Sequence, residues 1–411
     1  MKFPVWPNPS GYRDIDLGLS RVYDLLSRVG NPHLKLPPTI HIAGTNGKGS
    51  TLAFLRAIFS ESGLKIHSYT SPHLVNFNER IILADEEISD DFLNKILSEC
   101  KEAAERFPKI PVTFFEGITV AAFLAFSRVK ADLLLLEVGM GGRLDATNVL
   151  PKVLCSIITP ISFDHEEFLG KTLAKIAFEK AGIIKKNCPV FVGKQKKSAL
   201  QVIEERAQAM GSEAICRLST VDYRLSLEGA HQKENAALAI TVALAQKQFP
   251  VTQKQIENGI KKTFWPARLQ KIFSGKFFEM LPKSCELYLD GSHNLQGAGT
   301  VIKFLKLQKN KKIFVIFSML KDKNCEGFLK KISKEVDQLI ALTIPDETKS
   351  RTTDEINKIA KKIGINSVAA KNFDEAFRMI GKCDGEAVAL VCGSLYLAGN
   401  FLELNVTSMS C

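Results

Sequence analysis

Residues 39–51, TIHIAGTNGKGST, run from a short apolar stretch into a glycine-rich turn that carries Lys48 and then Ser50. Glycines in such a turn let backbone N–H groups approach a phosphate, and the following helix presents its positive end to the same anion. The strict Walker pattern is not met, because Ile42 stands where its first glycine belongs and Gly49 occupies its hydroxyl position. A plain glycine turn with one surface lysine is the competing interpretation. We expect a strand, a phosphate loop and a helix start that bind ATP through Gly44, Thr45, Asn46, Gly47, Lys48, Gly49 and Ser50.

The chain has the size and composition of a two-domain globular protein. Its 411 residues exceed what a single hydrophobic core usually supports. The shares of hydrophobic (45%) and charged (24%) residues are ordinary for such a protein. The first residues, MKFPVWPNPS, lack the apolar core of a signal peptide, and no apolar run reaches the roughly 20 residues that span a membrane. We therefore expect a soluble, cytoplasmic protein with no membrane partner.

Cysteine spacing and net charge bear on the compartment of the protein and on the charge of its ligands. The nine cysteines stand singly, without a C-x-x-C pair, as in proteins of a reducing cytoplasm. A formal net charge of +11 favours anionic ligands. The densest basic stretch, residues 303–312, lacks the interleaved aromatic residues of a nucleic-acid platform, so it is interpreted as a solvated helix face. The charge suggests anionic partners without saying which, and we expect no nucleic acid among them.

Strand and helix patterns alternate along the chain, which predicts an α/β fold. Residues 133–138 and 153–158 are continuous apolar runs, typical of strands buried on both faces of a parallel sheet. Each opens into a polar loop, GMGGRLDATN and TPISFDHEEFLG, at the strand end where open α/β sheets bind ligands. A second series begins with LYLD at residues 287–290. We expect an N-terminal P-loop ATPase-like domain with a mostly parallel sheet over residues 1–280, and a smaller Rossmann-like α/β domain over residues 281–411.

Several polar residues in these loops suit phosphate and metal chemistry. Lys48 can neutralise β- and γ-phosphate charge, and Ser50 is the nearest hydroxyl for Mg²⁺, which prefers oxygen ligands. Glu137 ends a buried strand, a costly place for an acid unless it meets a cation, although a glutamate that reaches solvent is the alternative. His165 could ligate a second metal or simply be a loop histidine. Lys180 lies in an otherwise apolar helix, where a buried ammonium without a partner is unfavourable. It therefore either pairs with an acid or has its charge altered by a chemical modification.

Two segments near the start of the second series are also candidates. DGSHN at residues 290–294 is either a ligand loop or a polar turn that caps the next helix through Asn294. Arg268 lies just before the expected domain boundary. It could contact the nucleotide phosphates as the domains close, or it could be only solvated.

Eight motifs occur together in a family-specific order. They are GTNGKGS, TSPHL, LEVGMGGRLDATN, DH..FLG, EKAGIIK, HQ..N, WPARLQ and DGSHN. In this order and spacing they resemble the folylpolyglutamate synthase and dihydrofolate synthase family, relatives of the Mur ligases, strongly over residues 14–300 and weakly beyond. The resemblance implies an ATP-dependent amide ligase that joins a pteroate or folate carboxylate to the amino group of L-glutamate through an acyl phosphate.

The resemblance also implies roles for individual residues. It implies that Mg²⁺ binds at two sites and that its ligands are Ser50, Ser71, Glu137 and His165. It implies Lys48, Lys180 and His165 in catalysis, with Lys180 carbamylated by CO₂. ATP contacts in addition to the loop are implied at Asn235, Arg268, Asp290 and His293. Three segments are similar to the family's pterin pocket: Leu17 and Gly18; Thr113, Phe114, Phe115 and Glu116; and Leu144, Asp145 and Ala146. Within the second segment, the resemblance implies that Phe114 or Phe115 stacks on the pterin ring. It also implies that Ser394 and Tyr396 lie near glutamate.

Some residues depart from the family pattern, and some alternatives stay open. Ala267 stands for a usual glycine, Ser292 for an alanine, and residues 318–324 follow the family loop only loosely. A Mur ligase would place a UDP-binding domain before the phosphate loop, yet only 43 residues precede Gly44. A kinase or nucleotide-gated binding module would release no ADP in response to glutamate. The segments LGLSRV and FFEG..T favour the bifunctional bacterial type over a monofunctional folylpolyglutamate synthase, and a monomer is expected.

Overall fold

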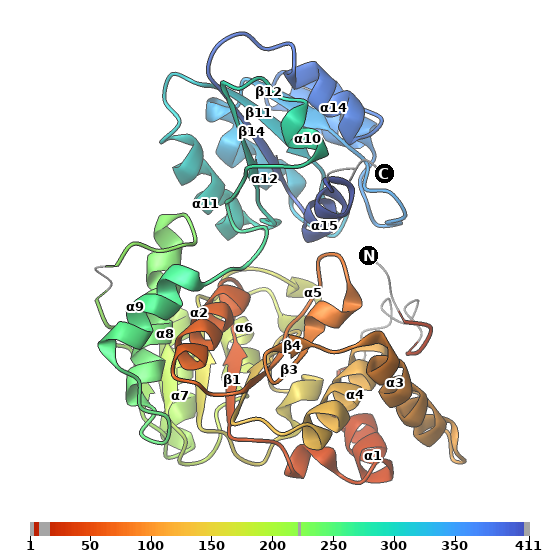
Figure 1. Cartoon of the computed structure of the whole chain (residues 1–411), viewed down its shortest axis with the longest axis vertical. Helices are drawn as coiled ribbons and strands as arrows, with labels where there is room; N and C mark the ends of the chain where they lie inside the picture. The colour runs from red at the N-terminus through yellow and green to blue at the C-terminus, as the bar shows by residue number, and fades with distance from the viewer. Residues whose placement is uncertain (1–3, 8–16, 221–222, 407–411) are drawn as a thin grey trace. The chain divides into compact units, whose positions relative to one another are not determined.

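The computed structural model describes residues 4–7, 17–220 and 223–406 (Figure 1). Its residues form two compact units, which are described separately. The N-terminal unit comprises residues 2–226 and 232–264, and the C-terminal unit comprises residues 227–231 and 265–411. The boundary predicted near residue 280 lies inside the C-terminal unit, because the strand and helix just before it pack with the second series.

In the described part of the N-terminal unit, eight strands form one sheet with the order β4-β3-β2-β5-β1-β6-β7-β8. The strands are β1 (Thr39–Ala43), β2 (Ile66–Tyr69), β3 (Ile81–Leu83), β4 (Glu86–Glu87), β5 (Leu133–Glu137), β6 (Cys155–Ile158), β7 (Val190–Val192) and β8 (Ala214–Ile215). The antiparallel pairs of this described sheet are β2 with β3 and β3 with β4, at one edge. The central strands β5 and β1 are buried along their whole length. The mostly parallel sheet that the apolar runs predicted is therefore confirmed.

Helices separate these strands along the chain. They are α1 (Ser20–Arg28), α2 (Lys48–Glu61), α3 (Asp90–Glu105), α4 (Phe114–Arg128), α5 (Glu166–Leu169), α6 (Leu173–Ala181), α7 (Lys197–Ala209), α8 (Ala230–Ala245) and α9 (Gln253–Lys262), with 3₁₀ turns η2 (Pro32–Leu34), η3 (Phe77–Arg80) and η4 (Ala146–Val149). Ser89 and Thr172 cap α3 and α6, and Thr252 forms a capping box with Gln255. Apolar residues at helical spacing also predict a helix over residues 14–29; α1 begins at Ser20, and residues 14–16 lie outside the described residues.

The C-terminal unit holds a second sheet, with the described strand order β13-β12-β11-β14-β10-β9. Its strands are β9 (Gln270–Ile272), β10 (Cys285–Leu289), β11 (Lys312–Phe317), β12 (Gln338–Ala341), β13 (Ser367–Ala369) and β14 (Ala387–Cys392). Its helices are α10 (Lys276–Glu279), α11 (Leu295–Leu305), α12 (Cys325–Ile332), α13 (Thr353–Lys362), α14 (Phe373–Ile380) and α15 (Leu395–Leu404), with the 3₁₀ turn η5 (Ser333–Glu335). All pairs are parallel except β10 with β9, so the predicted α/β series is confirmed and β9 is an unpredicted addition.

Candidate active site

The phosphate loop lies between β1 and α2, as the opening motif predicts. Gly44 and Gly47 have φ of 149° and 89°, values that side-chain-bearing residues rarely adopt. A Cβ on Gly44 would lie 1.8 Å from Thr159 Oγ1, and one on Gly47 would lie 2.5 Å from Asn235 Oδ1. Because both the backbone conformation and the space exclude a side chain, these two positions require glycine. The loop then leads directly into the N-terminus of α2, where anions are favoured.

The loop that follows β6 is fastened to the phosphate loop. The N–H groups of Thr45 and Asn46 donate to the carbonyl of Pro160, at 3.1 and 3.3 Å. Thr45 Oγ1 donates to the carbonyl of Ser162 and accepts from the N–H of Ser162, both at 3.1 Å. Since β1 and β6 are parallel neighbours, these contacts hold both strand-end loops at the same edge of the sheet.

Three predicted residues from three strand ends meet beside the loop. Lys48 Nζ lies 3.8 Å from Glu137 Oε1, and it also donates to the carbonyl of Thr45 at 3.4 Å. The backbone N–H of Ser71 donates to Glu137 Oε2 at 3.2 Å. Glu137 is only 4% exposed, so its carboxylate depends on these partners rather than on solvent. The structure thus places the buried acid next to a cation, as its position at the end of a buried strand suggested.

His165 occupies the loop between β6 and α5. It has a left-handed φ of 50° just before α5, and its Nε2 lies 3.9 Å from Asp164 Oδ1. Among the residues described, no three or more His, Cys, Asp or Glu side chains are grouped so as to hold a metal ion. The oxygen ligands available to a cation at this edge are the Glu137 carboxylate, serine hydroxyls, nucleotide oxygens and water. That oxygen-rich, water-retaining set is the kind that Mg²⁺ accepts.

Lys180 points from α6 to the start of the phosphate loop. Its Nζ donates to the carbonyl of Gly44 at 2.8 Å, and the residue is 5% exposed. Burial, and secondly the positive charge of Lys48, lower the pKa of the Lys180 ammonium to about 7, although Asp164 and Asp145 partly offset both effects. The hydrogen-bond partner is thus a backbone carbonyl, and the side chain loses its proton near neutral pH.

The segments predicted for the pterin pocket lie around the start of α4 and the turn η4. Thr113 caps α4 and forms a capping box with Glu116, which also accepts hydrogen bonds from Arg21. Phe114 is 1% exposed and belongs to the hydrophobic core, so it has no open face for a ligand. Phe115 is partly exposed, and its ring lies 2.3 Å from where a Cβ on Gly139 would stand. Of the two phenylalanines, Phe115 is the available stacking surface.

The remaining residues of this predicted set have defined surroundings. Asp145 is buried and accepts from Met140 N at 2.8 Å and from Thr147 N and Oγ1 at 3.0 and 2.5 Å. Thr147 Oγ1 in turn lies 2.9 Å from His41 Nε2. Ala146 is buried within η4, and Leu144, Leu17 and Gly18 are partly exposed.

Sequence reasoning missed how the segment around Ser71 is held. Arg80 Nε donates to His73 Nδ1 at 2.7 Å, and the Arg80 guanidinium lies 5.6 Å from the Phe77 ring centre and 5.9 Å from that of Phe114. Glu79 accepts from the N–H groups of residues 74, 75 and 76. Arg80 is 2% exposed, which is unusual for an arginine and which the sequence does not reveal. These two adjacent charged residues order the loop that carries Ser71.

In the C-terminal unit, the predicted residues gather at the end of β10. Asp290 is 2% exposed and accepts from Leu269 N at 2.8 Å and from Ser292 N at 2.9 Å. His293 Nδ1 donates to the carbonyl of Gly291 at 2.9 Å, and a Cβ on Gly291 would lie 3.2 Å from Arg268 Nη1. The same added Cβ would lie 2.3 Å from the side chain of Leu395, which stands between Ser394 and Tyr396. Ser394 caps α15 by accepting from Tyr396 N, and Asn294 caps α11 as one interpretation of DGSHN predicted.

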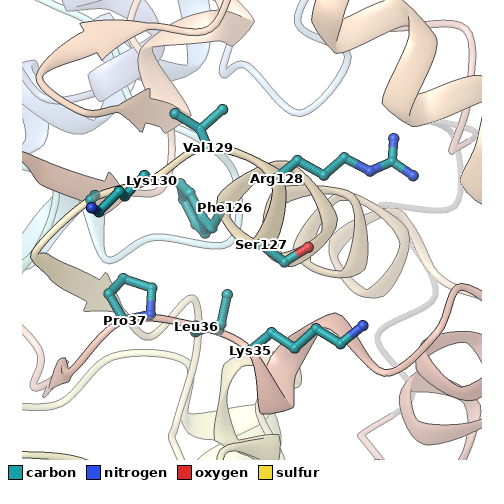
Figure 2. A pocket seen from close by; sticks show the side chains of 9 residues that line it. Lys35, Leu36, Pro37, Phe126, Ser127, Arg128, Val129 and Lys130 are labelled. Atoms are coloured by element: carbon teal, nitrogen blue, oxygen red, sulfur yellow. The ribbon is translucent and has the colours of Figure 1, made fainter.

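A separate hollow opens at the other end of the N-terminal sheet, where β1 and β5 begin (Figure 2). It has a volume of about 360 Å³ and is lined by residues 35–37 and 126–131. None of the residues predicted for the site is among this described lining. Among the helices described, none combines the length and apolar composition needed to cross a bilayer.

Comparison with known proteins agrees with this geometry. Residues 42–215 match the Mur ligase middle domain, and residues 275–404 match the C-terminal domain of dihydrofolate synthetase. The dihydrofolate synthase/folylpolyglutamate synthase of Bacillus subtilis (strain 168) is 32% identical, with 92% of this chain and 93% of that protein covered. The chain belongs to the dihydrofolate synthase/folylpolyglutamate synthase family. Its resemblance to this family, inferred from eight motifs, is therefore confirmed.

Solved structures of the dihydrofolate synthase/folylpolyglutamate synthase family share the fold. E. coli FolC in complex with DHPP and ADP is 28% identical with a TM-score of 0.84, and the match covers 95% of this chain and 93% of that one. A bifunctional folylpolyglutamate synthase/dihydrofolate synthase with Mn, AMPPNP and L-glutamate bound is 27% identical with a TM-score of 0.82, covering 95% and 94% of the two chains. Proteins named for this family are glutamate ligases, so the ligase class expected from the motifs is confirmed.

Proposed function

We propose that this protein uses ATP to join L-glutamate to dihydropteroate and, separately, to reduced folates. The observation that carries the proposal is the meeting of Lys48, Glu137 and Ser71 beside a phosphate loop, at the ends of three neighbouring parallel strands. Ligands bind at this end of open α/β sheets. The complexes of the related proteins with DHPP and ADP, and with AMPPNP and L-glutamate, support the same substrates here.

The chemistry needs an activated carboxylate, because a free carboxylate is a poor electrophile. A carboxylate oxygen of the pterin substrate attacks the γ-phosphorus of ATP, the bond to ADP breaks, and an acyl phosphate forms. The amino group of glutamate then attacks the acyl carbon, the amide forms, and inorganic phosphate leaves with the original carboxylate oxygen. Catalysis of this kind consists mainly of positioning and charge neutralisation. We assign that task to Lys48 and to backbone N–H groups at the start of α2, because the N–H groups of Thr45 and Asn46 are already bound to the carbonyl of Pro160.

We propose that magnesium binds at this edge of the sheet. The proposed ligands are the hydroxyls of Ser50 and Ser71, the Glu137 carboxylate and His165, shared between two cations. A bound cation would offset charge on the phosphate oxygens. The buried position of Glu137 next to Lys48 supports this part, since a second cation would further stabilise that carboxylate.

Lys180 is proposed to react with CO₂ and become a carbamate. The bond formed joins the lysine nitrogen to the carbon of CO₂, and one proton leaves the nitrogen. Only the uncharged amine reacts, and a pKa of about 7 makes that form available at neutral pH. The product is an anion that neutralises nearby positive charge, among it that of Lys48.

The remaining contacts complete the proposal. The further residues proposed to contact ATP are Asn235, Arg268, Asp290 and His293, and those proposed to contact glutamate are Ser394 and Tyr396. The folate substrate meets Phe115 and the neighbouring segments at residues 17–18, 113–116 and 144–146. We further propose a monomer in the cytoplasm, which agrees with the unpaired thiols of the described cysteines.

Two assays on one purified preparation test the proposal. Protein, MgATP and L-glutamate are incubated with dihydropteroate in one assay and with tetrahydrofolate in the other, and products are identified by mass spectrometry. We expect each substrate to gain one glutamate, with one ADP released for each amide formed. Product from tetrahydrofolate alone would mean a monofunctional folylpolyglutamate synthase. No glutamate-dependent ADP in either assay would reject the ligase and favour a kinase or nucleotide-gated module.

A further inference from the structure

A chain of buried amides links helix α8 to the phosphate loop. Asn235 Nδ2 donates to Gln232 Oε1 at 2.9 Å, and Gln232 Nε2 donates to Ser50 Oγ at 3.3 Å. Asn235 is 4% exposed, Ser50 is 2% exposed and Gln232 is 0% exposed. The other end of the Asn235 amide, Oδ1, lies where a side chain on Gly47 would stand. Both ends of the loop turn are therefore in contact with the same two amides.

The surroundings of Gln232 make a polar side chain there unusual. The following residues of α8 are mostly buried and apolar, among them 236–240 and 242–243. A buried amide costs free energy unless its hydrogen bonds are made, and an apolar side chain would pack without that cost. Gln232 makes its bonds to Asn235 on one side and Ser50 on the other, so each of its polar ends has a defined partner. The position therefore matches a role at the loop better than a role in the helix packing.

We propose that Gln232 is a positioning residue, which orients the hydroxyl of Ser50 for a divalent cation. A serine hydroxyl has one proton and two lone pairs. The N–H of Gln232 occupies one lone pair, so the second lone pair and the proton are confined to the remaining directions. Asn235 sets the orientation of the Gln232 amide by donating to its oxygen, which leaves the Gln232 nitrogen facing Ser50. The inference rests on the proposed function, because it takes Ser50 as a ligand of the nucleotide-bound cation.

The test measures cation binding directly, without turnover. Mn²⁺ is titrated into the full chain with ADP present, and free Mn²⁺ is followed by electron paramagnetic resonance. We expect Gln232→Met to bind Mn²⁺ about 3- to 10-fold more weakly, the effect of one net hydrogen bond. Gln232→Asn keeps an amide but is too short to reach Ser50, and we expect it to weaken binding equally, which covers the case that the methionine variant does not fold. Gln246→Met is the matched control, since Gln246 is a buried glutamine just beyond the far end of α8.

A double-mutant cycle distinguishes positioning from general damage. If Gln232 acts through Ser50, Gln232→Met changes Mn²⁺ binding little once Ser50→Ala is present. Equal weakening in both backgrounds, or unchanged binding in the single variants, would overturn the proposal. If the unsubstituted protein binds ADP but not Mn²⁺, the cation site itself is wrong and the proposal falls with it. If it binds neither ADP nor Mn²⁺, the proposed function fails at nucleotide binding. Measuring both ligands therefore distinguishes failure of the proposed function from failure of the cation site alone.

Discussion

Lys180 Nζ donates a hydrogen bond to the carbonyl of Gly44 at 2.8 Å, which ties helix α6 to the first residue of the phosphate loop. The nitrogen is buried, and burial together with the charge of Lys48 lowers its pKa to about 7. The proposed carbamate would keep one N–H on this nitrogen, so the hydrogen bond to Gly44 can persist after the modification.

The state of Lys180 predicts a pH dependence of carbamate formation. Because its pKa is lowered, the amine is mostly uncharged above about pH 7 and mostly protonated below it, and only the uncharged amine reacts with CO₂. We expect protein equilibrated with ¹³C-bicarbonate to show a carbamate signal by ¹³C NMR at about pH 8, with the signal lost toward about pH 6. Lys180→Ala should lack the signal and recover some activity with added short carboxylates. An equal signal in Lys180→Ala would assign the carbamate to another amine.

Lys48 is expected to neutralise phosphate charge rather than to contribute to core packing. Lys48→Ala removes the cation beside Glu137 and the proposed γ-phosphate, so ADP release should fall by at least about 10²-fold, the scale of losing one charge-stabilising group. The circular dichroism spectrum should not change, since the ammonium lies at the site and not in the core. Loss of the folded signal, or turnover close to that of the unsubstituted protein, would contradict this role.

The two neighbouring phenylalanines are expected to separate folding from folate binding. Phe115→Ala should raise the KM for dihydropteroate about tenfold or more, as loss of a stacking surface does, with a small change in stability. Phe114→Ala should lower the free energy of unfolding by about 3–5 kcal/mol, because it empties a core position. Urea unfolding and steady-state kinetics on both variants check this, and a similar KM effect without destabilisation in Phe114→Ala would reverse the assignment.

Arg80 is expected to stabilise the loop that carries Ser71. Arg80→Met removes the hydrogen bond to His73 and leaves that buried ring nitrogen without this donor, so the free energy of unfolding should fall by about 1–3 kcal/mol. Arg128→Met is the matched control, because Arg128 forms an exposed ion pair with Glu99 that is worth roughly 0–1 kcal/mol. Urea midpoints should therefore differ clearly between the two variants. Equal midpoints would mean that the buried contact adds nothing to stability.

Local patterns predicted most of the fold but little of the contact network. Continuous apolar runs such as residues 133–138 report burial on both faces of a sheet, and the Thr252 capping box reports a helix start, because both signals are local in sequence. Strand β9 has only three residues and pairs antiparallel, so it offers no periodicity to detect. The contact of Gln232 with Ser50 joins residues 182 positions apart, and no local pattern encodes it.

The candidate site shows the same division. The ends of parallel strands meet at one edge, so Lys48 and Glu137 could be placed near one another from the strand pattern, whereas Ser71 was added only by the family resemblance. The partner of Lys180 could not, because a backbone carbonyl carries no signature in side-chain chemistry. Which of Phe114 and Phe115 faces the core depends on the exact start of α4, and helix ends are the least determined feature of a sequence pattern.

The path of one oxygen atom tests the central claim most directly. Dihydropteroate labelled with ¹⁸O in its carboxylate is incubated with the protein, MgATP and L-glutamate, and the inorganic phosphate is analysed by mass spectrometry. Transfer of the γ-phosphoryl group to the carboxylate predicts one ¹⁸O in each phosphate released with ADP, together with dihydrofolate. Unlabelled phosphate, or label recovered in AMP, would contradict an acyl phosphate formed at this site.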